Sequence, residues 1–220
     1  MQCKVTRIED NIVYYTDNEG NELQAQGEKI LMSVGRRPVL KGYGLENIAI
    51  DTERGIKVNN VMQTSMHNVY AAGDVTGFSM LAHTASREAE VAVNHITGIN
   101  DSMTYNAIPG VVYTNPEVSC IGLNEEQAQK EGIDYKLCKL PMTYAGRFVA
   151  ENEGLTGLCK ILVDNNDRIV GMHMLGNPSS EFISAACLAI TNGITVEQMR
   201  RTVMPHPTVS EIVKECLFEL

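Results

Sequence analysis

The order of strand-like and helix-like segments beyond residue 110 most constrains the fold of this chain. Segments rich in β-branched and aromatic residues come first and predict strands. Apolar residues at helical spacing come later, as in Ile183, Cys187 and Ile190, and predict helices. A sheet followed by helices is typical of an α+β domain that folds as a separate unit. The expected strands are residues 111–114, 118–121, 135–140, 157–163 and 169–175, and the expected helices are residues 180–191, a short one from 195 and a last one from about 209.

The start of the chain contains strands but no accompanying helix. Residues 3–8, 12–16 and 29–34 are expected to be strands, with a turn at residues 17–21. Three short strands are too few to form a domain. We therefore interpret them as the end of a larger unit whose beginning is absent.

A strand, a turn and a helix follow in the middle of the chain. Residues 68–72 predict a short strand, which turns at Gly73 and Asp74 and leads to a helix expected over residues 80–96. Gly98 is the expected end of that helix. An aspartate at the carboxyl end of a strand, before a helix, marks the usual ligand position in an α/β sheet.

The composition excludes several classes of function. The 220 residues carry a net charge of −9 without a dense basic cluster, so neither nucleic acid nor an anionic membrane is an expected partner. We expect no membrane span, because no apolar run approaches the required length. The six cysteines are scattered, which indicates a reducing, cytoplasmic setting and mostly buried thiols. His173 and His206 lack neighbouring ligands at metal-binding spacing, so no metal site is expected.

A histidine and a glutamate near the end of the chain are candidates for acid–base chemistry. Glu211 can accept a hydrogen bond from one ring nitrogen of His206, which fixes the tautomer and raises the basicity of the other nitrogen. Spacing alone favours a second interpretation, in which Thr208 and Glu211 form a capping box at the start of the last helix. The two roles are compatible, because a rigid helix start is a good mount for a carboxylate.

Five short motifs, in order along nearly the whole chain, carry a resemblance to a known family. The chain resembles the C-terminal half of the dihydrolipoamide dehydrogenase branch of the FAD-dependent pyridine nucleotide–disulfide oxidoreductases. Glutathione and mercuric reductases share much of the pattern, and residues 80–83 and the ending after His206 favour the dihydrolipoamide branch. The motifs are Val34-Gly35-Arg36-Arg37-Pro38, Val69-Tyr70-Ala71-Ala72-Gly73-Asp74, Met80-Leu81-Ala82-His83, Tyr113-Thr114-Asn115-Pro116-Glu117-Val118 and His206-Pro207-Thr208-Val209-Ser210-Glu211.

The resemblance implies a fold and a domain organisation. It implies an α/β fragment, made of the end of an NAD domain and the second half of an FAD domain, followed by an α+β interface or dimerisation domain. The corresponding residues are 1–35, 36–104 and 105–220. The last domain is expected to form a homodimer. An incomplete flavin domain is expected to expose apolar surface that the missing strands would cover.

The resemblance also implies cofactor contacts. Asp74 would bind the ribityl chain of FAD, although a plain turn aspartate is the alternative. Gly35 and Val5 would lie at the NAD site, with a core strand position as the alternative for Val5. The residues expected beside the isoalloxazine ring, at a helix N-terminus that stabilises negative charge, are Met80, Leu81, Ala82 and His83, and an ordinary amphipathic helix start is their alternative.

The catalytic residues implied by the resemblance are His206 and Glu211. His206 would exchange a proton with a substrate dithiol, and Glu211 would orient it. In this family the base serves the redox disulfide of the other subunit, so the site exists in a dimer. The substrate would be dihydrolipoamide on the carrier domain of a multienzyme complex.

The sequence lacks parts that such an enzyme needs. It contains neither a G-x-G-x-x-G fingerprint nor a pair of cysteines with C-x-x-x-x-C spacing, so electrons have no path from dithiol to flavin. We expect the chain alone to have no dehydrogenase activity. Two alternatives remain open: a fragment of a glutathione-reductase-like or other disulfide reductase, and a non-catalytic dimerisation module.

Overall fold

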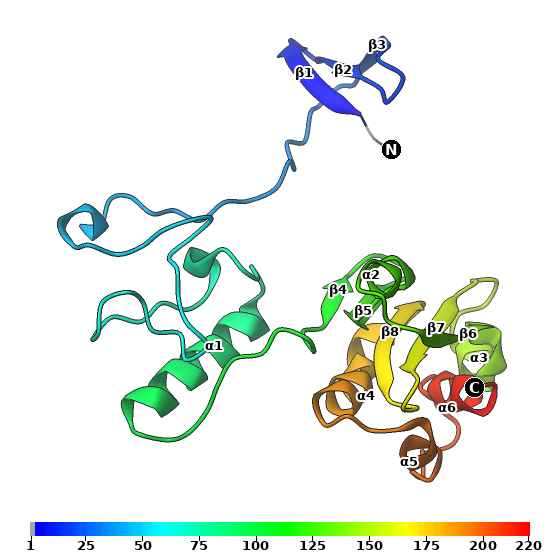
Figure 1. Ribbon diagram of the computed structural model, residues 1–220. Helices are drawn as coiled ribbons and strands as arrows, with labels where there is room; N and C mark the ends of the chain where they lie inside the picture. The colour runs from blue at the N-terminus through cyan, green and yellow to red at the C-terminus, as the bar shows by residue number, and fades with distance from the viewer. Residues whose placement is uncertain (1–2) are drawn as a thin grey trace.

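The structure is a computed structural model that describes residues 3–220, and its elements gather in three parts along the chain (Figure 1). The first part is a three-stranded antiparallel sheet in the order β1-β2-β3. Asp17 closes the turn between β2 and β3 by accepting hydrogen bonds from the backbone N–H groups of Glu19 and Asn21, each at 2.9 Å. The strands are β1 (Lys4–Glu9), β2 (Ile12–Thr16) and β3 (Glu22–Gln26).

The third strand differs from the one expected. Residues 29–34 are irregular, and the strand forms instead at Glu22–Gln26. The Asp17 turn reverses the chain at once, so the residues directly after it pair with β2 in spite of their weak β propensity. Leu31 and Val34, which made the later segment look strand-like, are 91% and 84% exposed because no strand lies beside them.

The second part is built around one long helix, α1 (Ala82–Ile96). Its inner face packs Val91 and Ala92 against Met62 and Met103 in a small core. The helix ends as expected before Gly98, which has a φ of 80°. The expected strand at residues 68–72 is wrong, because it is reduced to an isolated antiparallel bridge from Gln63 to Tyr70. Two short 3₁₀ turns complete this part, η1 (Leu45–Asn47) and η2 (Asp74–Thr76).

The outer face of α1 is partly apolar. Val93 and Ile96 are 56% and 61% exposed, although both are large hydrophobic residues. Exposed apolar surface of this kind marks a place where another surface normally packs.

The third part is the expected α+β domain. Its sheet is antiparallel and has the order β4-β5-β8-β7-β6, and residues 164–168 form the turn of a hairpin between β7 and β8. Helix α4 packs on β5 and β8, and helix α6 packs on β6 and β7. The strands are β4 (Gly110–Val112), β5 (Val118–Gly122), β6 (Tyr135–Pro141), β7 (Leu158–Asp164) and β8 (Ile169–Leu175). The helices are α2 (Glu125–Lys130), η3 (Met142–Tyr144), α3 (Gly146–Glu151), α4 (Ser179–Thr191), α5 (Val196–Arg200) and α6 (Glu211–Phe218).

The core of this domain lies between the sheet and helices α4 and α6. Ile161 and Met172 of the sheet and Ile212 of α6 are fully buried there. Cys138, Cys159 and Cys216 lie in the same core, and burial raises the pKa of the Cys138 thiol to about 12. The expectation of buried thiols therefore holds for these three, whereas Cys3 and Cys120 are exposed.

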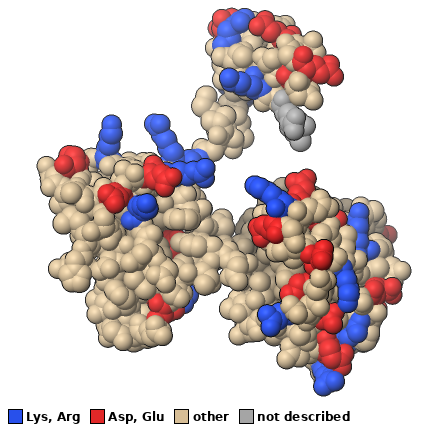
Figure 2. All heavy atoms as spheres, viewed as in Figure 1, with Lys and Arg blue, Asp and Glu red and all other residues tan. Residues whose placement is uncertain are grey.

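The surface carries mixed charge. Figure 2 shows acidic and basic side chains interspersed over the visible face of the domain that contains β4–β8. Among residues 3–220, no helix is both long and apolar enough to cross a membrane. The same residues contain no group of three or more metal-ligating side chains.

Candidate active site

His206 lies in the loop between α5 and α6, where Glu211 binds its ring. Nδ1 of His206 is 2.8 Å from Oε1 of Glu211. A carboxylate only accepts hydrogen bonds, so the neutral imidazole carries its proton on Nδ1 and leaves the lone pair on Nε2. The side chain of His206 is 81% exposed and that of Glu211 is 24% exposed. An oriented, solvent-facing Nε2 of this kind is suited to accept a proton from a bound substrate.

The second oxygen of Glu211 binds the start of helix α6. Oε2 accepts a hydrogen bond from the backbone N–H of Thr208 at 2.8 Å. This backbone hydrogen bond, followed by the hydrogen bond from His206, lowers the pKa of Glu211 below its ordinary value of 4.5. Glu211 therefore remains ionised at neutral pH.

The capping box expected at Thr208 and Glu211 is only half formed. Glu211 reaches back to the N–H of Thr208, but the hydroxyl of Thr208 donates to the carbonyl of Pro205 at 2.9 Å. Ser210 is the N-cap residue of α6, and its side chain makes no capping bond. The two interpretations of Glu211 are thus both present in one side chain, one on each oxygen.

Asp74 lies at the turn expected from the sequence. It opens the 3₁₀ turn η2 after Gly73, whose φ of 82° and ψ of −158° belong to a region that is essentially restricted to glycine. Thr76 fixes the turn, since both its N–H and its hydroxyl donate to the carbonyl of Gly73 at 2.9 Å. The carboxylate of Asp74 is exposed, and within residues 3–220 no donor binds it. It is therefore free to accept hydrogen bonds from the hydroxyl groups of a ligand.

The four residues predicted beside a flavin ring lie at the start of α1. Met80 and Leu81 precede the helix, which begins at Ala82, two residues later than expected. The helix has neither a side-chain cap nor an acidic residue in its first turn, so its N–H groups and positive dipole end are available to an anion. His83 is exposed, and its Nε2 donates to the carbonyl of Pro109 at 2.9 Å. This bond ties α1 to the segment that enters the next domain.

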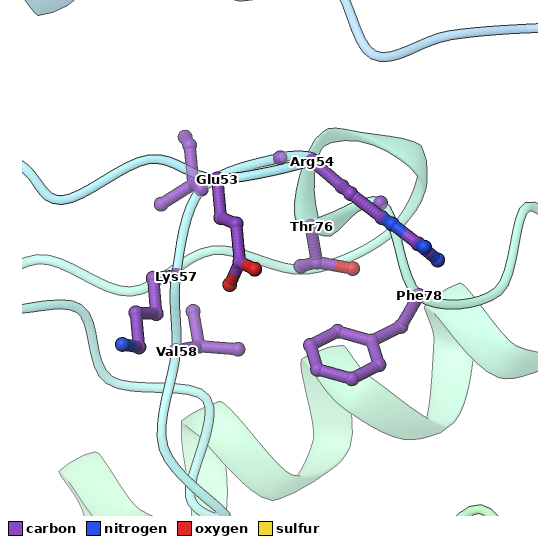
Figure 3. A pocket seen from close by; sticks show the side chains of 9 residues that line it. Glu53, Arg54, Lys57, Val58, Thr76 and Phe78 are labelled. Carbon is purple, nitrogen blue, oxygen red and sulfur yellow. The ribbon is translucent and has the colours of Figure 1, made fainter.

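A cavity of about 340 Å³ lies beside the Asp74 turn. Thr76 and Phe78 border it on one side and residues 53–58 on the other (Figure 3). Gly55 lies where these two segments touch. A Cβ at Gly55 would lie 2.3 Å from the carbonyl carbon of Thr76, so only glycine fits. The position of the turn therefore depends on this close approach.

The residues predicted at a nicotinamide site are not gathered into one pocket with the others. Val5 lies on β1 and is 51% exposed. Gly35 lies in the irregular segment after β3, with a φ of 105° and open space around the position of a Cβ. Figure 1 shows β1 and this segment well apart from α1. Their role in binding NAD stays a prediction.

His206 and Glu211 lie in a different part of the chain from the residues predicted beside a flavin. Figure 1 shows the loop between α5 and α6 far from the start of α1. An apolar groove of about 390 Å³ borders that loop, between α4, α5 and α6. Phe182 and Leu188 line it from α4, Val213 lines it from α6, and Met204 and Ser210 line it on either side of His206 and its neighbours. His206 is therefore placed next to a surface that can bind a second molecule.

Two polar residues near the Asp74 turn and α1 were missed from the sequence. Glu88 is fully buried on α1 and binds the N–H of Gly73, and Tyr105 binds the other oxygen of Glu88. The available signal was a glutamate at position 88 beside Val91 and Ala92 on the buried face of the helix. Helical periodicity placed it on that face, but only the fold brings it to Gly73.

Comparisons with known proteins agree with this architecture. The family described as "Pyridine nucleotide-disulphide oxidoreductase, dimerisation domain" matches residues 108–217. The family described as "Pyridine nucleotide-disulphide oxidoreductase" matches residues 1–89. The first match covers the α+β domain, and the second covers the β1–β3 sheet and the chain as far as the middle of α1.

Curated relatives are named dihydrolipoyl dehydrogenase. The mitochondrial protein of Caenorhabditis elegans is 40% identical over 200 residues, which are 90% of this chain and 40% of the relative. The Bacillus subtilis protein is 37% identical over 214 residues, which are 96% of this chain and 45% of the relative. The human mitochondrial protein is 40% identical over 189 residues, which are 84% of this chain and 37% of the relative. The chain thus spans less than half the length of these relatives.

Solved structures share the fold over nearly the whole chain. The crystal structure of LpdA from Mycobacterium tuberculosis has a TM-score of 0.83 at 25% identity, covering 99% of this chain and 47% of that one. A Cu(II) complex of a mutant of the HOCl-induced flavoprotein disulfide reductase RclA from Escherichia coli has a TM-score of 0.85 at 27% identity. The match covers 99% of this chain and 50% of that one. Together with the family matches, these similarities establish that the chain belongs to the pyridine nucleotide-disulphide oxidoreductase family.

Proposed function

We propose that this chain is the C-terminal part of a dihydrolipoyl dehydrogenase and that it supplies the acid–base residue of that enzyme. The observation that carries the proposal is the 2.8 Å contact between Nδ1 of His206 and Oε1 of Glu211, with Nε2 facing solvent. The relatives named dihydrolipoyl dehydrogenase, at up to 40% identity, support the choice of substrate class. The substrate is then a dithiol, dihydrolipoamide, carried by a domain of a multienzyme complex.

In the proposed reaction, His206 takes the proton of one substrate thiol on Nε2. The resulting thiolate attacks one sulfur of a redox disulfide on the partner subunit, which breaks that S–S bond and forms a mixed disulfide. The enzyme sulfur released in this step takes the proton from His206, which then removes the proton of the second substrate thiol. That second thiolate attacks the substrate sulfur of the mixed disulfide and displaces the other enzyme sulfur, which takes the second proton from His206, so the products are lipoamide and a dithiol enzyme. Glu211 stabilises the imidazolium that forms at His206, because its charge lies 2.8 Å from the ring nitrogen.

We propose FAD and NAD as the cofactors of the whole enzyme. FAD, when bound, supplies a two-electron acceptor between the dithiol and NAD. The residues of this chain fit half of such a site, because the Asp74 carboxylate is exposed and the N-terminus of α1 is uncapped. Asp74 would accept hydrogen bonds from ribityl hydroxyl groups, and the N–H groups at Ala82 and His83 would stabilise negative charge on the ring.

The homodimer is part of the same proposal. The groove of about 390 Å³ between α4, α5 and α6 is a candidate for the contact surface, since Leu188 on its edge is 64% exposed. Met204 and Ser210 also line this groove and bracket the His206 loop. A partner bound here would therefore bring its own residues next to His206. Such a contact explains how one chain can hold the base and another the disulfide.

The role of His206 can be tested in a hybrid enzyme. This chain would be joined to the N-terminal part of the Bacillus subtilis dihydrolipoyl dehydrogenase, of which it matches 45%. Replacing His206 with alanine is expected to lower lipoamide-dependent turnover by about 10²–10⁴-fold. The matched control is His67→Gln, at a position outside the proposed site, which should leave turnover unchanged. Equal activity of the wild-type and H206A hybrids would contradict the proposal, and preference for glutathione disulfide would favour the glutathione-reductase-like alternative.

The flavin half-site calls for a separate test on the chain itself. The purified protein would be incubated with excess FAD, and its visible absorbance recorded after removal of free cofactor. Retained flavin absorption supports the half-site around Asp74 and the start of α1. Loss of all flavin counts against that site and leaves the acid–base role of His206 to the hybrid enzyme.

A second candidate function is a non-catalytic dimerisation module. It is favoured by one observation: the six cysteines of the sequence include no pair at C-x-x-x-x-C spacing. This candidate predicts a stable dimer of the chain with neither flavin nor NADH-dependent lipoamide turnover.

We also propose a reducing compartment, because the thiols of Cys138, Cys159 and Cys216 are buried and free.

A further inference from the structure

Glu88 is a charged residue that the interior of the flavin half encloses completely. Its relative exposure is 0%, and it lies on α1 between the helix and the Asp74 turn. An ionisable carboxylate is costly to bury unless donors compensate both of its oxygens. Glu88 has one donor on each oxygen, so its burial is compensated by geometry specific to this site.

The first donor is the backbone of Gly73. Its N–H binds Oε2 of Glu88 at 2.6 Å, a short distance typical of a charge-assisted hydrogen bond. Gly73 has the φ of 82° and ψ of −158° that only glycine adopts easily, and a residue in such a conformation persists only where its surroundings enforce it. The next residue along the chain is Asp74. Glu88 therefore holds the backbone that aims the Asp74 carboxylate.

The second donor is Tyr105, from the segment that leads out of the flavin half. Its hydroxyl binds Oε1 of Glu88 at 2.7 Å, and its ring stacks on Phe78 at a centroid distance of 5.2 Å and an interplanar angle of 14°. Burial, and then the hydrogen bond to Glu88, raise the pKa of Tyr105, so its hydroxyl stays protonated and donates. Phe78 follows the Asp74 turn, so Tyr105 contacts the turn from its other end.

Tyr105 also reaches the neighbouring domain. Together with Leu123 and Arg168 it lines a cavity of about 480 Å³ at the junction with the β4–β8 sheet. Glu88 thus binds Gly73 of the turn with one oxygen, and with the other it binds Tyr105, which lines the cavity at the junction. His83 makes a parallel connection from α1 to Pro109, at 2.9 Å.

We propose that Glu88 is a positioning residue for the flavin half-site, which sets the conformation of the Gly73–Asp74 turn and links it through Tyr105 to the dimerisation domain. The inference rests on the proposed function in so far as Asp74 binds FAD. Glu88 itself is buried behind the turn and acts on the cofactor through Gly73 and Asp74.

The test compares substitutions of Glu88 in the full chain. Glu88→Ala removes both acceptors, and amide hydrogen exchange at Gly73 is expected to speed up at least about tenfold, with FAD binding weakened by a similar factor. Glu88→Gln keeps one carbonyl oxygen for the N–H of Gly73 and can donate its amide to the oxygen of Tyr105, so it should rescue most of the protection. FAD binding would be followed by the change in flavin fluorescence as each variant is titrated into FAD.

The matched control is Glu90→Gln on the same helix. Glu90 is 64% exposed and pairs with Arg87 at the surface, so its substitution should change neither measurement. Tyr105→Phe provides a second variant in case E88A does not fold. It leaves Glu88 with a single donor, and Gly73 is expected to exchange faster than in the wild type while the ring still stacks on Phe78.

The outcomes separate this inference from the proposed function. If E88A, E88Q and Y105F all leave Gly73 exchange within twofold of the wild type, the inference is wrong. Equal damage in E88Q and E88A also overturns it, because the acceptor for Gly73 would then be irrelevant. If the wild-type chain binds no FAD but Gly73 responds as expected, the proposed flavin site fails and the positioning role of Glu88 stands.

Discussion

At the scale of single residues, Glu211 combines two roles that usually belong to different side chains. Oε1 binds Nδ1 of His206 and Oε2 binds the N–H of Thr208, each at 2.8 Å. A carboxylate can accept from two donors at once, whereas an amide has a single acceptor oxygen. Position 211 therefore requires a carboxylate, because a polar side chain of the same size with one acceptor oxygen cannot accept both hydrogen bonds.

This requirement leads to a prediction for Glu211→Gln. The amide oxygen of the glutamine can bind the N–H of Thr208, and its NH₂ group then donates to Nδ1 of His206. The imidazole should shift towards the tautomer with its proton on Nε2, which cannot accept a proton from substrate. Nitrogen-15 NMR of His206 measures the tautomer directly, and an unchanged Nδ1–H form in E211Q would contradict the prediction.

The lowered pKa of Glu211 predicts how stability depends on pH. A carboxylate with a folded-state pKa below its ordinary value of 4.5 stabilises the protein above pH 4.5, and this contribution is lost as the pH falls through the folded-state pKa. Glu211→Ala should therefore lower the free energy of unfolding by about 1 kcal/mol at pH 7, a typical effect of losing a helix cap. Urea unfolding at a series of pH values checks this, and a difference that persists unchanged at low pH would count against it.

The sequence predicted the contact between His206 and Glu211 but missed Glu88. His206 and Glu211 are five residues apart, and their pairing follows from local spacing. Glu88 and Gly73 are separated by 15 residues, and they meet only because α1 folds back over the turn. Local patterns predict local pairs, whereas a buried partner across a turn depends on tertiary packing.

At the scale of elements, the segments that a turn or a cap determines were predicted best. The β7–β8 hairpin and the start of α5 match their predicted positions, because the turn at residues 164–168 and the Thr195 capping box define them locally. The strand expected at residues 29–34 failed, since strand formation needs a neighbour that this segment does not have. Helices α2 and α3 were missed because six residues carry too little periodicity to detect.

One prediction at this scale concerns the contact between residues 53–58 and the Asp74 turn. Gly55→Ala would place a Cβ 2.3 Å from the backbone of Thr76, so the two segments must separate. We expect faster amide exchange at Ile56 and Thr76, whose N–H groups bind carbonyls of this turn, and weaker FAD binding. Hydrogen exchange with mass spectrometry measures the first effect.

The control for that substitution is Gly146→Ala. Gly146 lies at the start of α3, where a Cβ meets no atom within 4 Å. Alanine should leave exchange near the Asp74 turn unchanged and stabilise the dimerisation domain by about 0.4–1 kcal/mol, because it reduces the entropy of the unfolded chain. Equal effects of G55A and G146A at the turn would show that steric contact is not the cause.

At the scale of the whole molecule, the three parts differ in the size of their cores. The β4–β8 domain has a continuous core between its sheet and helices α4 and α6. The part around α1 has a core of four buried residues, and within residues 3–220 no helix packs on the β1–β3 sheet. The boundaries at residues 35 and 104 stay predictions, as the family matches end at 89 and begin at 108.

The proposed dimer surface gives the prediction at this scale. Leu188→Glu places a charge in the apolar groove between α4, α5 and α6, where burying it on association is unfavourable. The dimer dissociation constant is expected to rise at least about tenfold, as measured by analytical ultracentrifugation. Val149→Glu is the control, since Val149 is 50% exposed on α3 outside the groove. A dimer that tolerates L188E but not V149E would place the interface elsewhere.

The two hydrogen bonds of Glu211 also make the orientation of His206 depend on temperature. Fraying of the first turn of α6 would release Glu211 from Thr208, and the imidazole of His206 would lose its fixed orientation in the same event. Local opening of a helix end requires much less free energy than melting of a core. Warming should therefore stop the proposed proton transfer at His206 well below the temperature at which the domain unfolds. Cooling should restore the transfer, because only the first turn of α6 has to re-form.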